Sequence, residues 1–405
     1  MTVKPRDFFF GPWRAVLVLG ITQILAWGAL FYPPVLTVPL IAADRGWSIG
    51  FSMGGFSLGL LVAGLVSPRV GAAIDRHGGH VVMPIGSLIG AIGLVALVHA
   101  EHPLAYLAVW AVLGAAMAAS LYDPAFATLG RIFGAGARPA ITALTLAGGF
   151  ASTVSWPATY ALIGALGWRG TYLVYAALLA LVAAPLHAFA LPRSRAEPDL
   201  PHHTSTGPPV GMLPAKGLAF VLVATAFAAY AFVPSGLAAH LLAMFQRFGL
   251  DAGTVVLIGA LFGPAQVAAR LLEFLFARAV HPLVIARFSV GILVLAFALM
   301  AALGLSSPVA ALFAVMFGAA NGLLTIARGT LPLALFGAAG YGRLIGRIAG
   351  PFLVIQAVAP LVLAIVSERY SDAAALAVTA AFALTALACL ALIRRPKPLS
   401  PGPVV

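Results

Sequence analysis

The stretch VVMPIGSLIGAIGLVALVH, residues 81–99, has no charged side chain apart from its final histidine and is long enough to cross a bilayer. A membrane-spanning helix needs about 20 mainly apolar residues. Eleven further stretches of this kind fill most of the chain. Their expected ranges are 13–37, 48–70, 104–130, 140–166, 168–190, 217–243, 254–277, 282–304, 308–334, 344–366 and 372–393.

The composition excludes a soluble domain of this length. Of the 405 residues, 62% are hydrophobic and 8% are charged, and the mean hydropathy is +1.06. In lipid, backbone N–H and C=O groups must pair within a helix or a closed barrel. The apolar runs are continuous and do not alternate, which excludes a barrel. The sequence therefore predicts an all-α membrane protein with 12 transmembrane helices.

The net charge of +12 could indicate a nucleic-acid partner, but the basic residues are spread over short segments. With the N-terminus placed in the cytoplasm, 17 of the 23 Lys and Arg lie on cytoplasmic segments and two, Arg270 and Arg328, lie within helices. By the positive-inside rule we expect a bacterial inner-membrane protein with both termini in the cytoplasm. The four basic residues expected outside are Arg45, Arg169, Arg247 and Arg369.

Neither a cofactor nor an enzymatic activity is expected. The single cysteine, Cys389, excludes an internal disulfide and a cysteine metal cluster. The chain has no GxxxxGK[ST] phosphate loop and no HExxH motif. The first apolar stretch is too long for a removable signal peptide, and no cleavage signal follows it, so we expect it to be retained.

A polar, proline-rich segment divides the chain into two halves. Residues 192–216 cannot bury an apolar face and are expected to form a cytoplasmic linker between six-helix bundles at 1–191 and 217–405. Matching short motifs recur at offsets of 201 to 203 and suggest a duplication, as in transporters built from repeats. The matches are Phe133-Gly134-Ala135 with Phe336-Gly337-Ala338, Ala147-Gly148 with Ala349-Gly350, Pro157 with Pro360, and Pro33 with Pro234.

The loop after the second stretch contains Gly71, Asp75, Arg76 and Gly78 in the order G-x-x-x-D-R-x-G. This loop resembles that of the major facilitator superfamily, and the resemblance extends to the twelve helices, the two halves and the central linker. It departs from the family at His80 and Val81, where one or two basic residues are usual, and the second half has no recognisable copy. The resemblance implies that Asp75 and Arg76 help to latch the two halves on the cytoplasmic side.

Within the superfamily the chain is most similar to the monocarboxylate-porter branch. The similarity lies in Gly46-Trp47-Ser48, in the stretch from Asp75 to Met83, and in Gly167-Trp168-Arg169. In that branch an arginine of the eighth helix serves anionic substrates, and Arg270 lies where the resemblance places that residue.

Four charged residues lie deep in the expected helices, where each costs about 2.5–3.5 kcal/mol or more. They are Asp123, Arg270, Glu273 and Arg328, two of each sign, so the interior is formally neutral. Gln266, Arg270 and Glu273 share one helix face at i, i+4 and i+7. Arg270 can bind a carboxylate bidentately. Glu273 either neutralises Arg270 until protonation frees it, or forms a permanent ion pair with it that only fixes packing.

Asp123 and Arg328 lie on equivalent helices of the two halves, the fourth and the tenth. They are expected to pair across the interface and close the inner gate. Alternatively, Asp123 carries the proton, or it pairs locally with Arg131. Further polar candidates for substrate contact are Gln23, Trp27, Tyr32, Tyr122 and Asn321, with interhelical hydrogen bonding as the alternative for each.

The sequence therefore predicts a secondary transporter that moves a small carboxylate-containing organic anion together with a proton. Arg270 would hold the anion and Glu273 or Asp123 the proton, while Gly71, Asp75, Arg76, Gly78 and Arg328 would act in gating. The rival within transport is proton-driven movement of a drug, vitamin or amino-acid-like metabolite. A membrane sensor or embedded enzyme is the rival from another class. The expected partners are substrate, protons and lipid, with no nucleic acid, and the expected state is a monomer.

Overall fold

The computed structural model describes residues 11–193, 217–277 and 279–394, which form helices and no strand. The predicted linker at 192–216 lies almost entirely outside this part of the chain. The helices are α2 (Arg14–Leu30), α3 (Pro34–Arg45), α4 (Ile49–His77), α5 (Gly79–His99), α6 (Pro103–Ser120), α7 (Tyr122–Phe133), α8 (Arg138–Gly148), α9 (Ala151–Leu178), α10 (Leu218–Arg247), α11 (Ala252–Ala260), α12 (Phe262–Phe276), α13 (Pro282–Leu303), α14 (Ser307–Phe336), α15 (Tyr341–Arg369) and α16 (Asp372–Leu392), with a 3-10 turn η1 (Gly134–Gly136) and π-helical turns η2 (Leu179–Ala183) and η3 (Leu186–Ala190).

Twelve membrane crossings follow from eleven continuous stretches in the described residues that are long and apolar enough to span a bilayer. One of them, Arg138–Ala190, has 53 residues, which is enough for two crossings at 1.5 Å per residue. The chain reverses within it at Gly167, whose φ of 67° is a backbone conformation that favours glycine. The predicted all-α fold is therefore confirmed.

Most predicted helix ends agree with the structure to within a few residues. The first helix was predicted to end at 37, whereas α3 continues to Arg45. This error arises because helix one is broken at 31–33 and restarts at Pro34, and proline is favoured in the first turn of a helix. Helices four, five and eight are also broken, near Leu121, Gly149 and Leu261. Broken membrane helices are tolerated where they line a cavity or pack within protein.

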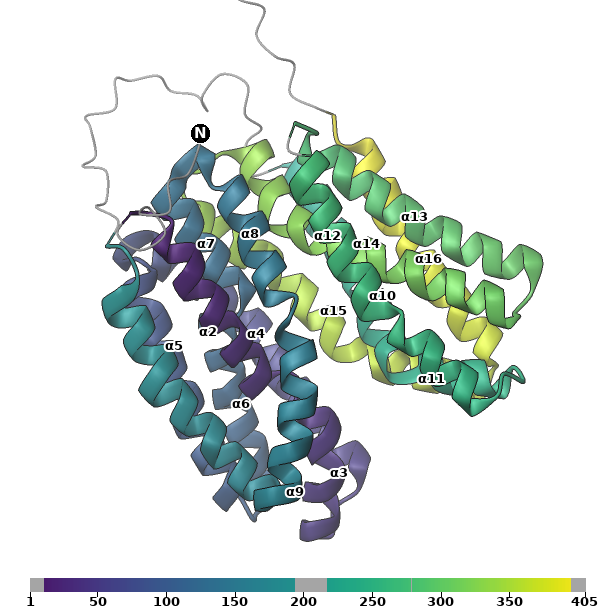
Figure 1. Ribbon diagram of the computed structural model, residues 1–405, viewed down its shortest axis with the longest axis horizontal. Helices are drawn as coiled ribbons and strands as arrows, with labels where there is room; N and C mark the ends of the chain where they lie inside the picture. Colours follow the sequence, from purple (N-terminus) through teal and green to yellow (C-terminus); the bar gives the residue numbers. More distant parts are fainter. Residues whose placement is uncertain (1–10, 194–216, 278, 395–405) are drawn as a thin grey trace, which may run out of the picture.

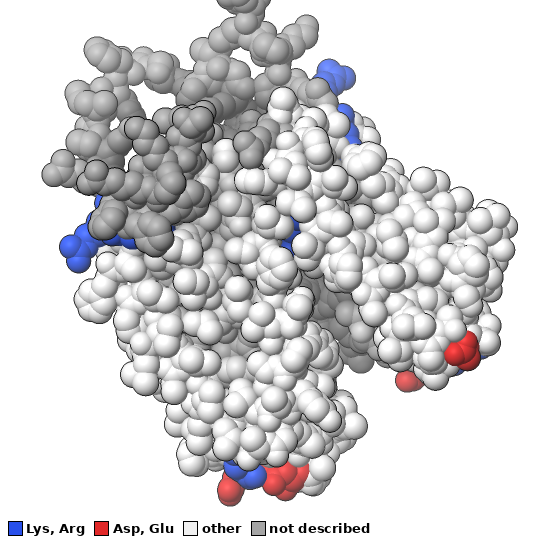
Figure 2. Space-filling view, viewed as in Figure 1, with Lys and Arg blue, Asp and Glu red and all other residues white. Residues whose placement is uncertain are grey.

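The helices form two bundles (Figure 1). We call the helices of residues 14–190 the N-bundle and those of 218–392 the C-bundle. The bundles meet at one end and diverge toward the other, and Figure 2 shows the wedge-shaped hollow between them. The end where they meet, which carries Asp75 and Arg138, is the closed end. The opposite end, which carries Asp44 and Asp372, is the open end.

At the closed end α4 of the N-bundle and α15 of the C-bundle pack backbone against backbone. A methyl group at Gly71 would overlap the carbonyl of Gly342, and one at Gly346 would overlap the carbonyl of Ser67. Small residues permit such an approach between membrane helices. The residues in contact are Gly64, Ser67 and Gly71 of α4 and Gly342, Gly346 and Gly350 of α15.

At the open end each bundle joins its first helix to its last by a bidentate ion pair. Arg169 donates to both carboxylate oxygens of Asp44, at 3.0 and 2.7 Å. Arg247 donates to both oxygens of Asp372, at 2.6 and 2.8 Å, and this hydrogen bonding raises the pKa of Arg247. The second pair lies 203 positions after the first, with the two charges exchanged.

Candidate functional site

Arg270 of α12 is buried at the interface and reaches from the C-bundle into the N-bundle. Its Nη1 donates to the carbonyl of Thr145 at 3.1 Å, while Nε and Nη2 donate to the carbonyl of Gly322 and the hydroxyl of Thr325, both at 3.4 Å. Thr145 lies in the last turn of α8, where the partial negative charge of the helix end favours a cation. A guanidinium has five N–H groups, so these bonds leave one on Nη1 and one on Nη2.

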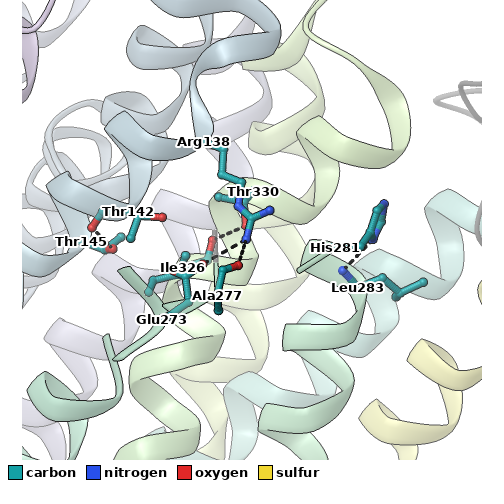
Figure 3. Close-up of polar contacts among 9 residues, drawn as sticks. All are labelled: Arg138, Thr142, Thr145, Glu273, Ala277, His281, Leu283, Ile326 and Thr330. Atoms are coloured by element: carbon teal, nitrogen blue, oxygen red, sulfur yellow. Dashed lines mark hydrogen bonds and ion pairs between the residues drawn. The ribbon is translucent and has the colours of Figure 1, made fainter. Parts of the chain in front are cut away.

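Glu273 pairs with an arginine of the other bundle and not with Arg270. Arg138, the first residue of α8, places Nη2 3.2 Å from a carboxylate oxygen of Glu273 and donates to the carbonyl of Ala277 at 3.0 Å (Figure 3). The side chain of Glu273 is 3% exposed and that of Arg138 is 22% exposed. The expected Arg270–Glu273 pair is therefore wrong: the two share a helix face, but Glu273 finds its cation across the interface.

Asp123 of α7 and Arg328 of α14 form the cross-bundle ion pair that the sequence predicts, with 2.5 Å between Oδ1 and Nη2. The alternative partner of Asp123, Arg131, instead donates to the backbone carbonyl of Asp75. Asp123 also lies in the first turn of α7, where the helix end favours a carboxylate. The Arg328 guanidinium lies 4.2 Å from the ring centroid of Phe352 on α15.

Around Arg270, the described part of the interface carries one positive charge in excess. Arg138, Arg270 and Arg328 lie there with Asp123 and Glu273, and each of these two carboxylates belongs to an ion pair that excludes Arg270. Within residues 11–193, 217–277 and 279–394, no carboxylate oxygen lies within 4.0 Å of the Arg270 guanidinium. The four residues expected in the interior balance in charge, and the excess comes from Arg138, whose side chain is 22% exposed. The partners of Arg270 are neutral carbonyl and hydroxyl groups, which an anionic ligand could supplement.

Several aromatic side chains of the N-bundle lie beside these charges. The amide of Gln23 donates to the carbonyl of Ser120 at 2.8 Å and accepts from the indole N–H of Trp27 at 3.1 Å. The centroid of the Trp27 ring lies 5.1 Å from Tyr122 and 5.9 Å from Tyr32. Gln23 is fully buried, so it serves to hold Trp27 in place.

Tyr122 and Arg270 meet the end of α8 at adjacent residues: a methyl group at Gly148 would overlap the Tyr122 hydroxyl, and one at Gly149 would overlap Arg270 Nη1. The hydroxyl of Tyr230 donates to Asn321 Oδ1 at 2.9 Å, so Asn321 forms a hydrogen bond between helices, the alternative role expected for it. Gln266 differs from the other candidates, because its close contact with Gly322 runs through its backbone carbonyl.

The predicted gating residues differ in what they contact. The carboxylate of Asp75, near the end of α4, accepts from the backbone N–H groups of Gly342 and Arg343 at 2.8 and 2.7 Å. These groups lie in the first turn of α15, so Asp75 caps a helix of the other bundle. Arg76 is exposed and forms no ion pair with any described residue. Gly78 ends α4 with a φ of 83°.

Sequence reasoning missed four residues of this site. In the sequence, Arg138 is counted only among the cytoplasmic basic residues. Phe31, Tyr230 and Phe352 are aromatic residues within apolar stretches, and nothing in their spacing distinguishes them from core residues. They lie against Trp27, Asn321 and Arg328, respectively.

Two bundles closed by ionic contacts at one end and hollowed at the other are the architecture of a secondary transporter. The sequence model of the Major Facilitator Superfamily matches residues 16–323, and the chain belongs to this family. It is a multi-pass membrane protein of a family of transporters.

Solved structures share the fold. The human organic anion transporter MFSD10 (TETRAN) is 18% identical, with a TM-score of 0.68 over 96% of this chain and 100% of that one. The proton:xylose symporter XylE, bound to 6-bromo-6-deoxy-D-glucose, is 12% identical, with a TM-score of 0.69 over 95% and 97%. The transporter FucP, in its outward conformation, is 12% identical, with a TM-score of 0.68 over 93% and 97%. No curated protein matches the sequence of this chain.

Proposed function

We propose that the protein moves a small organic anion with a carboxylate group across the bacterial inner membrane, coupled to protons, and that it works as a monomer by alternating access. It would belong to the monocarboxylate-porter-like branch. The closed end would face the cytoplasm, because ten arginines of the described residues lie there and four at the open end. Those at the closed end are Arg14, Arg69, Arg76, Arg131, Arg138, Arg193, Arg287, Arg343, Arg347 and Arg394.

The observation that carries the proposal is the excess positive charge at Arg270. A buried cation held only by neutral groups is costly in a membrane protein. A carboxylate would offset this cost, and the N–H groups left on Nη1 and Nη2 fit its two oxygens. Arg138 and Arg328 differ from Arg270, because each already pairs with a carboxylate.

Alternating access requires the contacts of the closed end to break. Because Arg270 binds Thr145 of the other bundle, separation of α8 from α12 removes that partner. A substrate carboxylate on Arg270 would replace it, so that opening at the cytoplasmic end costs less with substrate bound. This differential contact is what a ligand needs in order to shift a conformational equilibrium.

Proton coupling would act on the carboxylates that join the bundles. Protonation of Glu273 would remove its charge from the pair with Arg138, and protonation of Asp123 would do the same to Arg328. Either event weakens the closed end. Glu273→Gln, which imitates the protonated group, should retain exchange of substrate across proteoliposomes while losing its acceleration by a pH gradient.

The test of substrate class is Arg270→Gln. In purified protein, binding of carboxylate-containing organic acids should weaken by about 30-fold or more, since loss of one partner of a buried charge pair costs about 2–5 kcal/mol. Isothermal calorimetry and counterflow in proteoliposomes measure it. The matched control is Arg287→Gln, because Arg287 caps carbonyls of α16 within the C-bundle. Unchanged carboxylate binding in Arg270→Gln, or ligands confined to cations, would refute the proposal.

A further inference from the structure

An aromatic wall lies beside Arg270, and part of it borders a small cavity between the bundles. It consists of Trp27, Phe31, Tyr32 and Tyr122. From it we infer that the transported anion carries a planar ring in addition to its carboxylate. Arg270 would bind the carboxylate and the wall would stack against the ring. This inference rests on the proposed function and narrows its substrate class to aromatic carboxylates.

The break in helix one creates the wall. The backbone N–H groups of Phe31 and Tyr32 both bond to the carbonyl of Trp27, at 3.1 and 3.0 Å, because the chain leaves α-helical geometry here. In a continuous helix, consecutive residues point about 100° apart and could not both stack on one side chain. Here the rings of Phe31 and Tyr32 lie 4.7 and 5.9 Å from that of Trp27.

Trp27, Phe31 and Tyr32 of the wall are each partly exposed, and Tyr122 is 7% exposed. Tyr106 and Trp110, which Phe56 connects to the wall, are at most 1% exposed. Trp27 and Phe31 border a small cavity together with the Asp123–Arg328 pair, and the residues opposite them come from α15 of the C-bundle: Leu353 and Gln356.

The dimensions place the ring at the wall and not within the cavity. The cavity measures about 20 Å³, which is room for one water molecule. A ring would therefore lie over its mouth, with α15 on the opposite side. A methyl group at Gly148 would overlap the Tyr122 hydroxyl, and one at the next residue, Gly149, would overlap Arg270 Nη1. The wall and the guanidinium therefore lie at adjacent positions, and we expect one small molecule to span both.

The test compares two acids of equal size, benzoate and cyclohexanecarboxylate. The wild-type protein should bind benzoate about tenfold more tightly, because stacking against aromatic side chains adds about 0.5–1.5 kcal/mol beyond area burial. In Trp27→Leu and Phe31→Leu this ratio should fall to near one, while both acids still depend on Arg270. Calorimetry with each acid gives the ratio.

The matched control is Trp47→Leu, which removes a partly exposed tryptophan with aromatic neighbours at the open end and should leave the ratio unchanged. Tighter or equal binding of the saturated acid by the wild-type protein, with both acids still requiring Arg270, would overturn the inference and leave the proposed function standing. Binding of neither acid, with binding of aliphatic carboxylates that require Arg270, would do the same. Acid binding that ignores Arg270 would instead refute the proposed function.

Discussion

The two helix pairs that join the bundles at the closed end, α4 with α15 and α8 with α12, occupy equivalent places in the two halves but use different physics. The first pair packs backbone on backbone, and Asp75 caps the N-terminal end of α15. The second pair is held by charged side chains, and Arg138 caps the C-terminal end of α12 through the carbonyl of Ala277.

The difference indicates where the transport cycle can be controlled. Backbone contact depends on shape, so ligands and protons change it little. The α8–α12 contact contains Glu273, which can be protonated, and Arg270, which can exchange a carbonyl for a carboxylate. A cavity of about 40 Å³ beside Arg138 and Glu273 also shows that this pair is less closely packed. Under the proposed function, the α4–α15 pair would set the geometry of closure, and the α8–α12 pair would make closure depend on substrate and proton.

Gly346→Leu should have the largest effect on the closed end. The side chain would collide with the backbone of Ser67, which cannot move away without displacing α4. Overpacking costs about 1–3 kcal/mol, and we expect the upper end, a shift of about 100-fold toward separation of the closed end. The readout is thiol labelling of Thr142→Cys in a Cys389→Ser background, because Thr142 is buried at the α8–α12 contact.

Gly291→Leu is the matched control, since an added side chain at Gly291 meets nothing within 4 Å. If Gly346→Leu folds and Thr142→Cys is labelled no faster than in the parent, the α4–α15 contact does not hold the closed end together.

Arg138→Gln should have an intermediate effect. It leaves the buried carboxylate of Glu273 without its cation, and a hydrogen bond to a charged group contributes about 1.5–3 kcal/mol. Because Arg138 is partly exposed, we expect the lower figure, about a tenfold increase in labelling at the same cysteine. Adding Glu273→Gln should recover part of the loss. A double variant that is simply additive would contradict a direct interaction.

Substitutions of Asp75 should have the smallest effect on the closed end. Asp75→Ala removes a helix cap and should cost about 1 kcal/mol, whereas Asp75→Asn should cost less because asparagine is also a good cap. Arg76 is one position away and exposed. Arg76→Ala should change the free energy of separating the closed end, as measured by labelling, by less than about 0.5 kcal/mol. Equal losses for the Asn and Ala variants would show that the charge of Asp75, and not its capping bonds, closes this end.

The fold could be predicted from the sequence because lipid makes the signal strong: each crossing is a long apolar run, and the structure follows the predicted ranges closely. The Asp123–Arg328 pair was also predictable, from deep burial of opposite charges on equivalent helices. The partners of Arg270 were not, because Thr145 and Gly322 contribute backbone carbonyls, which every residue has. Arg138 was missed because it lies at the start of a helix, where a basic residue is counted with the cytoplasmic segments and not with the buried charges.

The break in helix one was equally hard to foresee. Pro33 and Pro34 signal an interruption, yet proline occurs inside several unbroken helices of this protein, such as α4 and α10. Whether such a residue bends or breaks a helix depends on which neighbours satisfy the released backbone groups. Phe31 and Tyr32 both contact Trp27 only because the helix breaks here, so the aromatic wall had no signature in the sequence.

The two ion pairs at the open end exchange their acidic and basic residues between the halves, so a sequence comparison of the halves does not detect them. Asp44 with Arg169 and Arg247 with Asp372 make the same brace between first and last helix, yet an alignment of the halves by residue type scores both positions as reversals of sign. The two halves therefore share the ion pair between their first and last helices, but not the residue type at either position. Each of these ion pairs lies within one bundle. A rocking motion of the bundles would therefore leave both pairs intact, and the open end of each bundle would move as a rigid body.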